Sequence, residues 1–89
     1  MNWNVSFTTK AGKQAQKLPK RERDLIALLV REMQLFGPVR SDWKNYSKLG
    51  VGTYHCHLSY RWVVCWRVEG KQLKLIEIYY AGSRENAPY

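Results

Sequence analysis

Hydrophobic and polar residues alternate at the start of the chain. The apolar members of this pattern are Trp3, Val5 and Phe7. A period of two is typical of a strand with one buried face, so we predict a half-buried strand over residues 2–8. Thr8 or Thr9 can cap the helix that we expect next, over about residues 10–17.

The hydrophobic period then lengthens to three and four residues. Leu18-Pro19 breaks the first helix, and Pro19 suits the first turn of a second helix over residues 20–36. Gly37-Pro38 ends that helix, since glycine favours the C-cap and proline stops propagation. We expect its apolar residues to line its buried side: Leu25, Ile26, Leu28, Leu29, Met33 and Phe36.

Alternation returns in the second half of the chain, after an irregular connection over residues 39–50. Three strands are expected there, over about residues 53–58, 62–68 and 73–80. The middle strand is apolar on both faces and is therefore expected in the centre of the sheet. The order predicts one α+β domain over residues 1–89. In it, the N-terminal strand pairs with a three-stranded antiparallel meander, and a two-helix hairpin covers one face of this single sheet.

The charge of the chain narrows the class of partner. Fifteen Lys and Arg oppose seven Asp and Glu, giving a net charge of +8. Such a balance indicates a polyanionic partner, although some basic proteins are merely soluble. No apolar run approaches the ~18 residues of a membrane span, and the N-terminus lacks the pattern of a secretory signal. Two cysteines, Cys56 and Cys65, suit half-buried free thiols in a reducing cytoplasm.

Candidate chemistry lies on the first strand of the meander. His55 and His57 share one strand face, and the other face is apolar. A zinc site built from these histidines with Cys56 and Cys65 is disfavoured, because neighbouring residues of a strand point apart. Proton-transfer groups beside fixed cations are what phosphodiester cleavage needs. The cations and the phenol that follow are Arg61, Arg67, Arg84 and Tyr89.

Each candidate also has a structural alternative. The histidine pair can be two polar residues on a solvent-facing strand face. Arg61 and Arg67 can form surface salt bridges with Glu69 or Glu77, and Arg84 can belong to a solvated tail.

In several segments, the chain resembles the RelE/ParE superfamily of bacterial toxins from toxin–antitoxin pairs. The segments that carry the resemblance are Lys17-Leu18-Pro19, Tyr46-Ser47-Lys48-Leu49-Gly50, Tyr54-His55-Cys56-His57-Leu58 and Ala81-Gly82-Ser83-Arg84-Glu85. Toxins similar to RelE cut messenger RNA in the ribosomal A site without a metal. The resemblance therefore implies a cytoplasmic endoribonuclease that needs no cofactor and that inhibits translation.

The resemblance also implies site residues and partners. The implied catalytic set is His55, His57, Arg61, Arg84 and Tyr89, with Arg67 as a substitute for Arg61. RelE has lysines where this chain has the two histidines. Basic residues expected to face RNA are Lys10, Lys13, Lys17, Lys20, Arg21, Lys48 and Arg67. The implied partners are messenger RNA, the ribosome and a cognate antitoxin that binds in a hetero-oligomeric complex.

Two other functions remain open at this point. ParE-type members of the superfamily poison DNA gyrase and lack a catalytic set of this kind. A basic RNA-binding or ribosome-associated module without catalysis would also account for the charge. Cleavage of translated messenger RNA would distinguish the ribonuclease from both.

Overall fold

The computed structural model describes residues 2–70 and 72–89. In chain order the elements are β1 (Asn4–Phe7), α1 (Thr9–Gln16), α2 (Lys20–Phe36), β2 (Ser47–Gly50), β3 (Thr53–His57), β4 (Trp62–Gly70), β5 (Leu75–Ser83) and a short 3-10 helix, η1 (Arg84–Asn86). This is the α+β class that the sequence predicts. The second helix has the predicted bounds.

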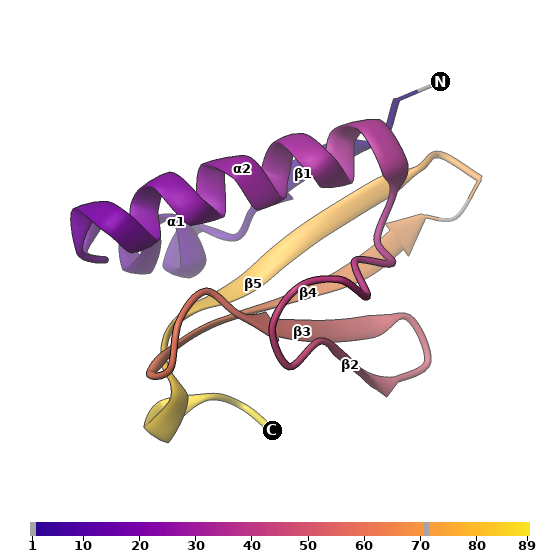
Figure 1. Cartoon of the computed structure of the whole chain (residues 1–89). Coiled ribbons are helices and arrows are strands. Elements are labelled where there is room, and N and C mark those ends of the chain that lie inside the picture. Colours follow the sequence, from indigo (N-terminus) through magenta and orange to yellow (C-terminus); the bar gives the residue numbers. More distant parts are fainter. Residues whose placement is uncertain (1, 71) are drawn as a thin grey trace.

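One five-stranded sheet organises the molecule, with the strand order β1-β5-β4-β3-β2. β1 pairs in parallel with β5, and the other neighbours are antiparallel. β4 is central, as its two apolar faces predict. Both helices lie on one side of this sheet, and the C-terminal segment lies on the other side (Figure 1). The sheet thus has one face covered by helices and one face left for other contacts.

The helix ends follow from local chemistry. The Thr8 side chain accepts a hydrogen bond from the Ala11 backbone N–H at 3.0 Å, which caps α1. Gly37 ends α2 with φ of +93°, a conformation that residues with a Cβ rarely adopt. The Trp3 indole lies against this glycine, and an added Cβ would come within 3.0 Å of its nitrogen. The end of α2 is thereby packed against the strand that opens the chain.

The main core fills the space between the helices and the sheet. Among its fully buried side chains are Trp66, Leu29, Met33, Ile76 and Ile78. None of the helices within residues 2–70 and 72–89 is both long and apolar enough to cross a bilayer.

The predicted buried side of α2 was wrong at two positions. Leu28 and Phe36 are 50% and 67% exposed. The buried residues of the helix are Glu22, Ile26, Leu29 and Met33. Leu28 lies two residues from Ile26, about 200° around the helix, and so points away from the sheet. Phe36 ends the helix, and the Arg40 guanidinium lies 5.5 Å from its ring instead.

The connection over residues 39–50 was predicted to be irregular throughout, and this was also wrong. Its last residues form β2, which pairs with β3 so that Ser47 lies opposite His55 and Lys48 lies opposite Tyr54. The meander therefore has four strands rather than three. The position of β2 at the sheet edge brings Ser47 beside the candidate site.

Candidate active site

His55 and His57 occupy the face of β3 that points away from the helices. The alternating residues Tyr54, Cys56 and Leu58 belong to the main core on the other face. Both histidines are nonetheless buried, with exposed fractions of 7% and 6%. They share one face as predicted, but that face is not open to solvent at these positions.

A second, smaller apolar cluster lies beside the histidines. It consists of Val63, Cys65 and Tyr80, with Leu49, Tyr79 and Ala87 packed against it. The segment after β5 folds back onto this face of the sheet (Figure 1). It brings the ring of Tyr89 to a centroid distance of 4.4 Å from His55, whose own ring lies 5.6 Å from that of His57. Three aromatic groups that can exchange protons thus meet from two distant parts of the sequence.

The surroundings favour neutral imidazoles. Burial lowers the pKa of His55, and a hydrogen bond to the Ser47 backbone partly offsets this effect. Burial also lowers the pKa of His57, and repulsion by His55 in its protonated form, by Arg84 and by Lys44 lowers it further. Because both pKa values lie below the ordinary 6.5, both rings are neutral at pH 7 and able to accept a proton.

Tyr89 has the opposite shift. Burial is the main cause that raises its pKa above the ordinary value of 10, and the neighbouring Arg84 guanidinium partly opposes this rise. The phenol therefore keeps its proton at neutral pH. It is better suited to donating a hydrogen bond or a proton than to acting as a base.

The two predicted cations Arg61 and Arg84 line a common pocket of about 280 Å³, together with Tyr60, Ser83 and Glu85. The Arg84 backbone N–H donates to the Arg61 carbonyl oxygen at 2.7 Å, which joins the β3–β4 turn to the end of β5. The Arg84 guanidinium lies over the Tyr60 ring at 4.7 Å. Within residues 2–70 and 72–89, neither arginine forms an ion pair with a carboxylate. Both charges are therefore available to an anion.

Arg67 is placed differently. Its guanidinium binds the carboxylates of Glu69 and Glu77 and lies over the Tyr79 ring at 4.7 Å. Two carboxylates therefore balance its charge, in agreement with the alternative that Arg67 forms surface salt bridges. The pocket shared with Arg84 is lined by Arg61 and not by Arg67.

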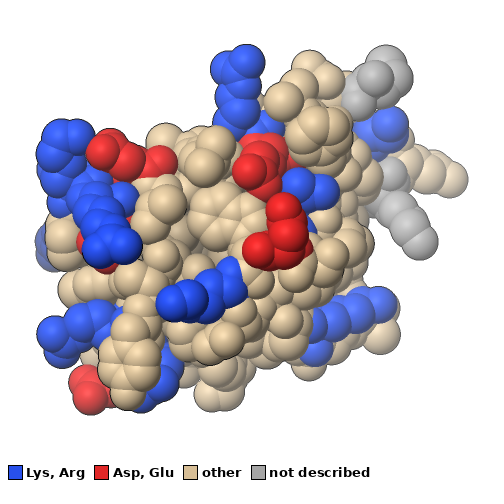
Figure 2. All heavy atoms as spheres, viewed as in Figure 1, with Lys and Arg blue, Asp and Glu red and all other residues tan. Residues whose placement is uncertain are grey.

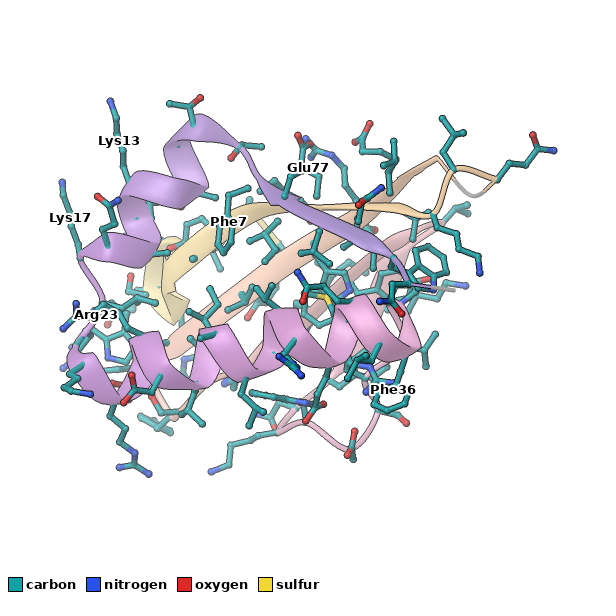
Figure 3. All side chains as sticks on the ribbon, turned by 90° about the horizontal axis from the view of Figure 1, so that it is seen from above. Phe7, Lys13, Lys17, Arg23, Phe36 and Glu77 are labelled. Carbon is teal, nitrogen blue, oxygen red and sulfur yellow. The ribbon has the colours of Figure 1, made fainter. Side chains whose placement is uncertain are left out.

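The basic residues predicted to face RNA are spread over several surfaces. Figure 2 shows Lys and Arg side chains gathered at the end of the molecule where α2 begins. Lys13 and Lys17 point outward from α1 (Figure 3), and Lys10 is also exposed on this helix. α1 contacts the sheet on the face opposite the histidines. Lys48 is exposed on β2.

Of these basic residues, Arg21 shares a surface groove with Arg61. It lines a groove of about 570 Å³ that also includes Lys44 and Arg61, so positive charge continues from α2 to the β3–β4 turn. Lys20, its neighbour in sequence, is paired with Asp24 at 2.9 Å.

Three residues of this region had no role assigned from the sequence: Lys44, Ser47 and Tyr60. The Lys44 carbonyl accepts a hydrogen bond from the His57 backbone N–H at 2.8 Å. The Ser47 hydroxyl lies 2.9 Å from the Nδ1 atom of His55. The segment that holds the first two has no periodic pattern, so the sequence alone offers no signal for them.

The two thiols are less exposed than predicted. Cys56 and Cys65 are fully buried, and burial is the main cause that raises the pKa of each to about 12. They are protonated at neutral pH and unsuited to nucleophilic chemistry.

No protein-family model and no curated protein matches this sequence. Solved structures do match over nearly the full chain. The RelE of the archaeal RelE–RelB complex from Pyrococcus horikoshii is 19% identical, with 98% of this chain and 100% of that chain covered and a TM-score of 0.75. A chain of the E. coli DinJ–YafQ toxin–antitoxin complex is 12% identical, with both chains fully covered at 100% and a TM-score of 0.77.

The YoeB dimer from Staphylococcus aureus is a third match. It is 17% identical, with 92% of this chain and 97% of that chain covered and a TM-score of 0.72. Identities this low establish the fold. The chain has the fold of the RelE, YoeB and YafQ toxins of the RelE/ParE superfamily.

Proposed function

We propose that this protein is the toxin of a type II toxin–antitoxin system and a metal-independent endoribonuclease that cleaves messenger RNA on the ribosome in the cytoplasm. One observation carries the proposal. Two buried imidazoles and the Tyr89 phenol lie close together, and Arg84, whose charge acts on both His57 and Tyr89, lines a pocket with Arg61. Among the described residues, neither arginine forms an ion pair with a carboxylate. The fold shared with RelE, YoeB and YafQ supports the toxin role.

The proton-transfer groups suit cleavage through the substrate's own 2′-hydroxyl. One histidine accepts the 2′ proton while the 2′ oxygen attacks the adjacent phosphorus. The bond from phosphorus to the 5′ oxygen breaks, and a second group of the cluster gives that oxygen a proton. The other histidine in its protonated form and the Tyr89 hydroxyl are the candidates for this donor. The products are a 2′,3′-cyclic phosphate and a free 5′-hydroxyl.

The arginines suit the charge that develops during this reaction. Negative charge builds on the phosphate oxygens that take no part in bond making or breaking. Guanidinium groups placed there stabilise the transition state more than the ground state. Arg61 and Arg84 come from different elements but are joined through a backbone hydrogen bond of 2.7 Å. Their positive charge can take the part that a metal ion takes in other nucleases.

A cognate antitoxin is the expected protein partner. Matching chains come from the RelE–RelB, DinJ–YafQ and YoeB–YefM complexes. The net charge of +8 favours an acidic antitoxin. We expect it to cover the groove shared by Arg21, Lys44 and Arg61, because Arg61 also lines the pocket with Arg84.

A cleavage assay with purified ribosomes and a translated message tests the proposal. Wild-type protein should cut the message with and without EDTA, at magnesium levels that keep the ribosomes intact. The His55→Ala/His57→Ala double variant should be inactive while circular dichroism shows that it remains folded. Arg31→Ala removes an exposed cation from α2 and serves as a control with unchanged activity.

Three other results would each reject part of the proposal. Full activity in the folded double variant would remove the histidines from the mechanism. Intact message together with gyrase-dependent DNA breaks in poisoned cells would indicate the ParE-type function. RNA binding without turnover would leave a non-catalytic module.

A further inference from the structure

The two arginines of the pocket lie against aromatic rings. The Arg84 guanidinium carbon is 4.7 Å from the centroid of the Tyr60 ring. The Arg61 guanidinium carbon is 6.0 Å from the ring of Trp62, at the limit of the ~6 Å range of a cation–π contact. Glu85 also lines the pocket, but among the described residues it forms no ion pair with either arginine. The nearer contact, between Tyr60 and Arg84, is the stronger candidate for a role.

A ring orients a guanidinium without cancelling its charge. Arg67 shows the contrast, because it lies over the Tyr79 ring at the same distance of 4.7 Å but also binds two carboxylates. Those carboxylates occupy N–H donors of the guanidinium and offset its charge. An aromatic ring attracts the cation through its π electrons and carries no net charge. Arg84 therefore keeps its positive charge for a phosphate.

Tyr60 and the backbone restrain Arg84 at its two ends. Tyr60 belongs to the turn between β3 and β4, whereas Arg84 begins η1 after β5. The Arg84 backbone N–H donates to the Arg61 carbonyl oxygen of the same turn at 2.7 Å, which fixes the start of the arginine side chain. The Tyr60 ring contacts the guanidinium at the other end. A side chain restrained in this way has less conformational freedom to lose when it binds a ligand.

The exposure of Tyr60 argues against a purely structural role. Its side chain is 74% exposed, and it belongs to neither apolar cluster. Replacing the ring with a smaller apolar side chain therefore leaves no cavity in the core.

We propose that Tyr60 is a positioning residue whose ring holds the Arg84 guanidinium in the pocket, where it binds the phosphate of the RNA. This inference rests on the proposed ribonuclease function. Tyr60 acts through Arg84 and need not touch the substrate.

The contact can be measured without RNA. Ring currents shift the resonances of protons that lie over the face of an aromatic ring, so the side-chain protons of Arg84 should be shifted upfield in the wild-type protein. Tyr60→Phe keeps the ring and should keep this shift. Tyr60→Leu should abolish it, while circular dichroism shows that the variant remains folded. Unshifted Arg84 protons in the wild-type protein would overturn the proposal.

Single-turnover cleavage rates give the second readout. Tyr60→Leu should lower the rate by roughly two- to fivefold, the size of a cation–π contact at an exposed position, and Tyr60→Phe should retain the wild-type rate. In an Arg84→Ala background, Tyr60→Leu should have no further effect, because the ring then has no cation to hold.

Phe36→Leu is the matched control. It removes another exposed ring that lies beside a guanidinium, that of Arg40 at 5.5 Å. Phe36 ends α2, whereas Arg21, near the start of this helix, shares the groove with Arg61. The control should therefore keep the wild-type cleavage rate.

The double variant separates this role from direct contact with RNA. If Tyr60→Leu lowers the rate by the same factor with and without Arg84, Tyr60 acts on the RNA itself, as by stacking on a base, and the proposal is overturned. If the wild-type protein cuts no RNA, the proposed function fails, while the spectra still decide whether Tyr60 holds Arg84.

Discussion

The two buried imidazoles link the site to the stability of the protein. They are the only histidines in the chain. Each has a pKa below 6.5 in the folded state, chiefly because burial removes the water that would solvate its charge. As pH falls, the unfolded chain therefore binds protons before the folded protein does. The neutral imidazoles therefore make their full contribution to the free energy of unfolding above about pH 6.5. This contribution is lost as pH falls toward the pKa values of the folded state.

We therefore predict that the free energy of unfolding decreases as pH falls below about 6.5. Urea unfolding followed by tryptophan fluorescence at several pH values would measure this. A His55→Gln/His57→Gln double variant should show a smaller decrease over the same range, since it has no imidazole to protonate. If the urea concentration at the midpoint of unfolding of the wild-type protein stays constant or rises as pH falls from about 6.5 to 5, the burial of neutral histidines is contradicted.

Arg84 and Arg67 provide a second test at the level of single residues. Arg84 has no carboxylate partner among the described residues, whereas Arg67 binds Glu69 and Glu77. We predict that Arg84→Ala lowers the cleavage rate by roughly 10²-fold or more, as expected for a group that stabilises transition-state charge. Arg67→Ala should retain activity within a few-fold. Single-turnover cleavage rates would measure both effects. If the two variants lose the same fraction of the rate, ion pairing does not distinguish the roles of the two arginines.

At the scale of elements, what the sequence predicts depends on the chemistry that fixes each element. α2 has its predicted bounds because Pro19 has a fixed φ that suits the start of a helix, and Gly37 can adopt the positive φ that ends it. β2 was missed because its four residues carry little apolar pattern. They become a strand only through pairing with β3, which is a tertiary effect.

The candidate site also combines features that local sequence determines with features that depend on tertiary contacts. Strand alternation places His55 and His57 on one face from the sequence alone. Their burial, and the approach of Tyr89, depend on how the segment after β5 folds back over the sheet. No local pattern encodes that path, and the contact of His55 with Ser47 likewise depends on the tertiary pairing of β2 with β3.

The end of β5 allows a prediction about how Arg84 is held. The Tyr80 hydroxyl donates a hydrogen bond to the Ser83 carbonyl at 2.7 Å, one residue before Arg84. A Cβ added at Gly82 would lie 2.9 Å from this hydroxyl oxygen and 3.1 Å from the ring carbon that bears it. Gly82→Ala should therefore displace Tyr80, lower cleavage by about tenfold and cost roughly 1–3 kcal/mol of stability.

Gly12→Ala is the matched control for this variant. An added Cβ there would meet only the Phe7 Cβ, at an ordinary 3.8 Å. Because alanine is the better helix former, this variant should stabilise α1 by up to about 1 kcal/mol and leave cleavage unchanged. Chemical denaturation and the cleavage assay measure both quantities. Equal activity of the two variants would remove the proposed link between Tyr80 and Arg84.

At the scale of the whole molecule, the net charge of +8 predicts how binding responds to salt. We expect the affinity for a 2′-deoxy oligonucleotide, which cannot be cleaved, to fall linearly on a plot of log K against log salt concentration. Each phosphate contact to a single strand contributes about 0.7 to the slope. Arg61→Ala and Arg84→Ala should each reduce the slope by about that amount, because both line the pocket.

Fluorescence anisotropy over a series of salt concentrations measures these slopes. Arg31→Ala removes the same charge from the outer surface of α2, away from the pocket, and should leave the slope unchanged. If all three variants reduce the slope equally, the oligonucleotide binds through the overall charge of the protein and not through the pocket.

The strand order also constrains when the protein acquires its shape during synthesis. β5 is the last strand made, yet it lies inside the sheet between β4 and β1, the first strand made. While the nascent chain is still being extended through β4, β1 has no neighbour to pair with, and Arg84 and Tyr89 do not yet exist. Folding must bring together segments about 70 residues apart, which favours a late and cooperative closure. Under the proposed function, the nascent chain therefore has no assembled site on the ribosome that makes it until translation has passed β5.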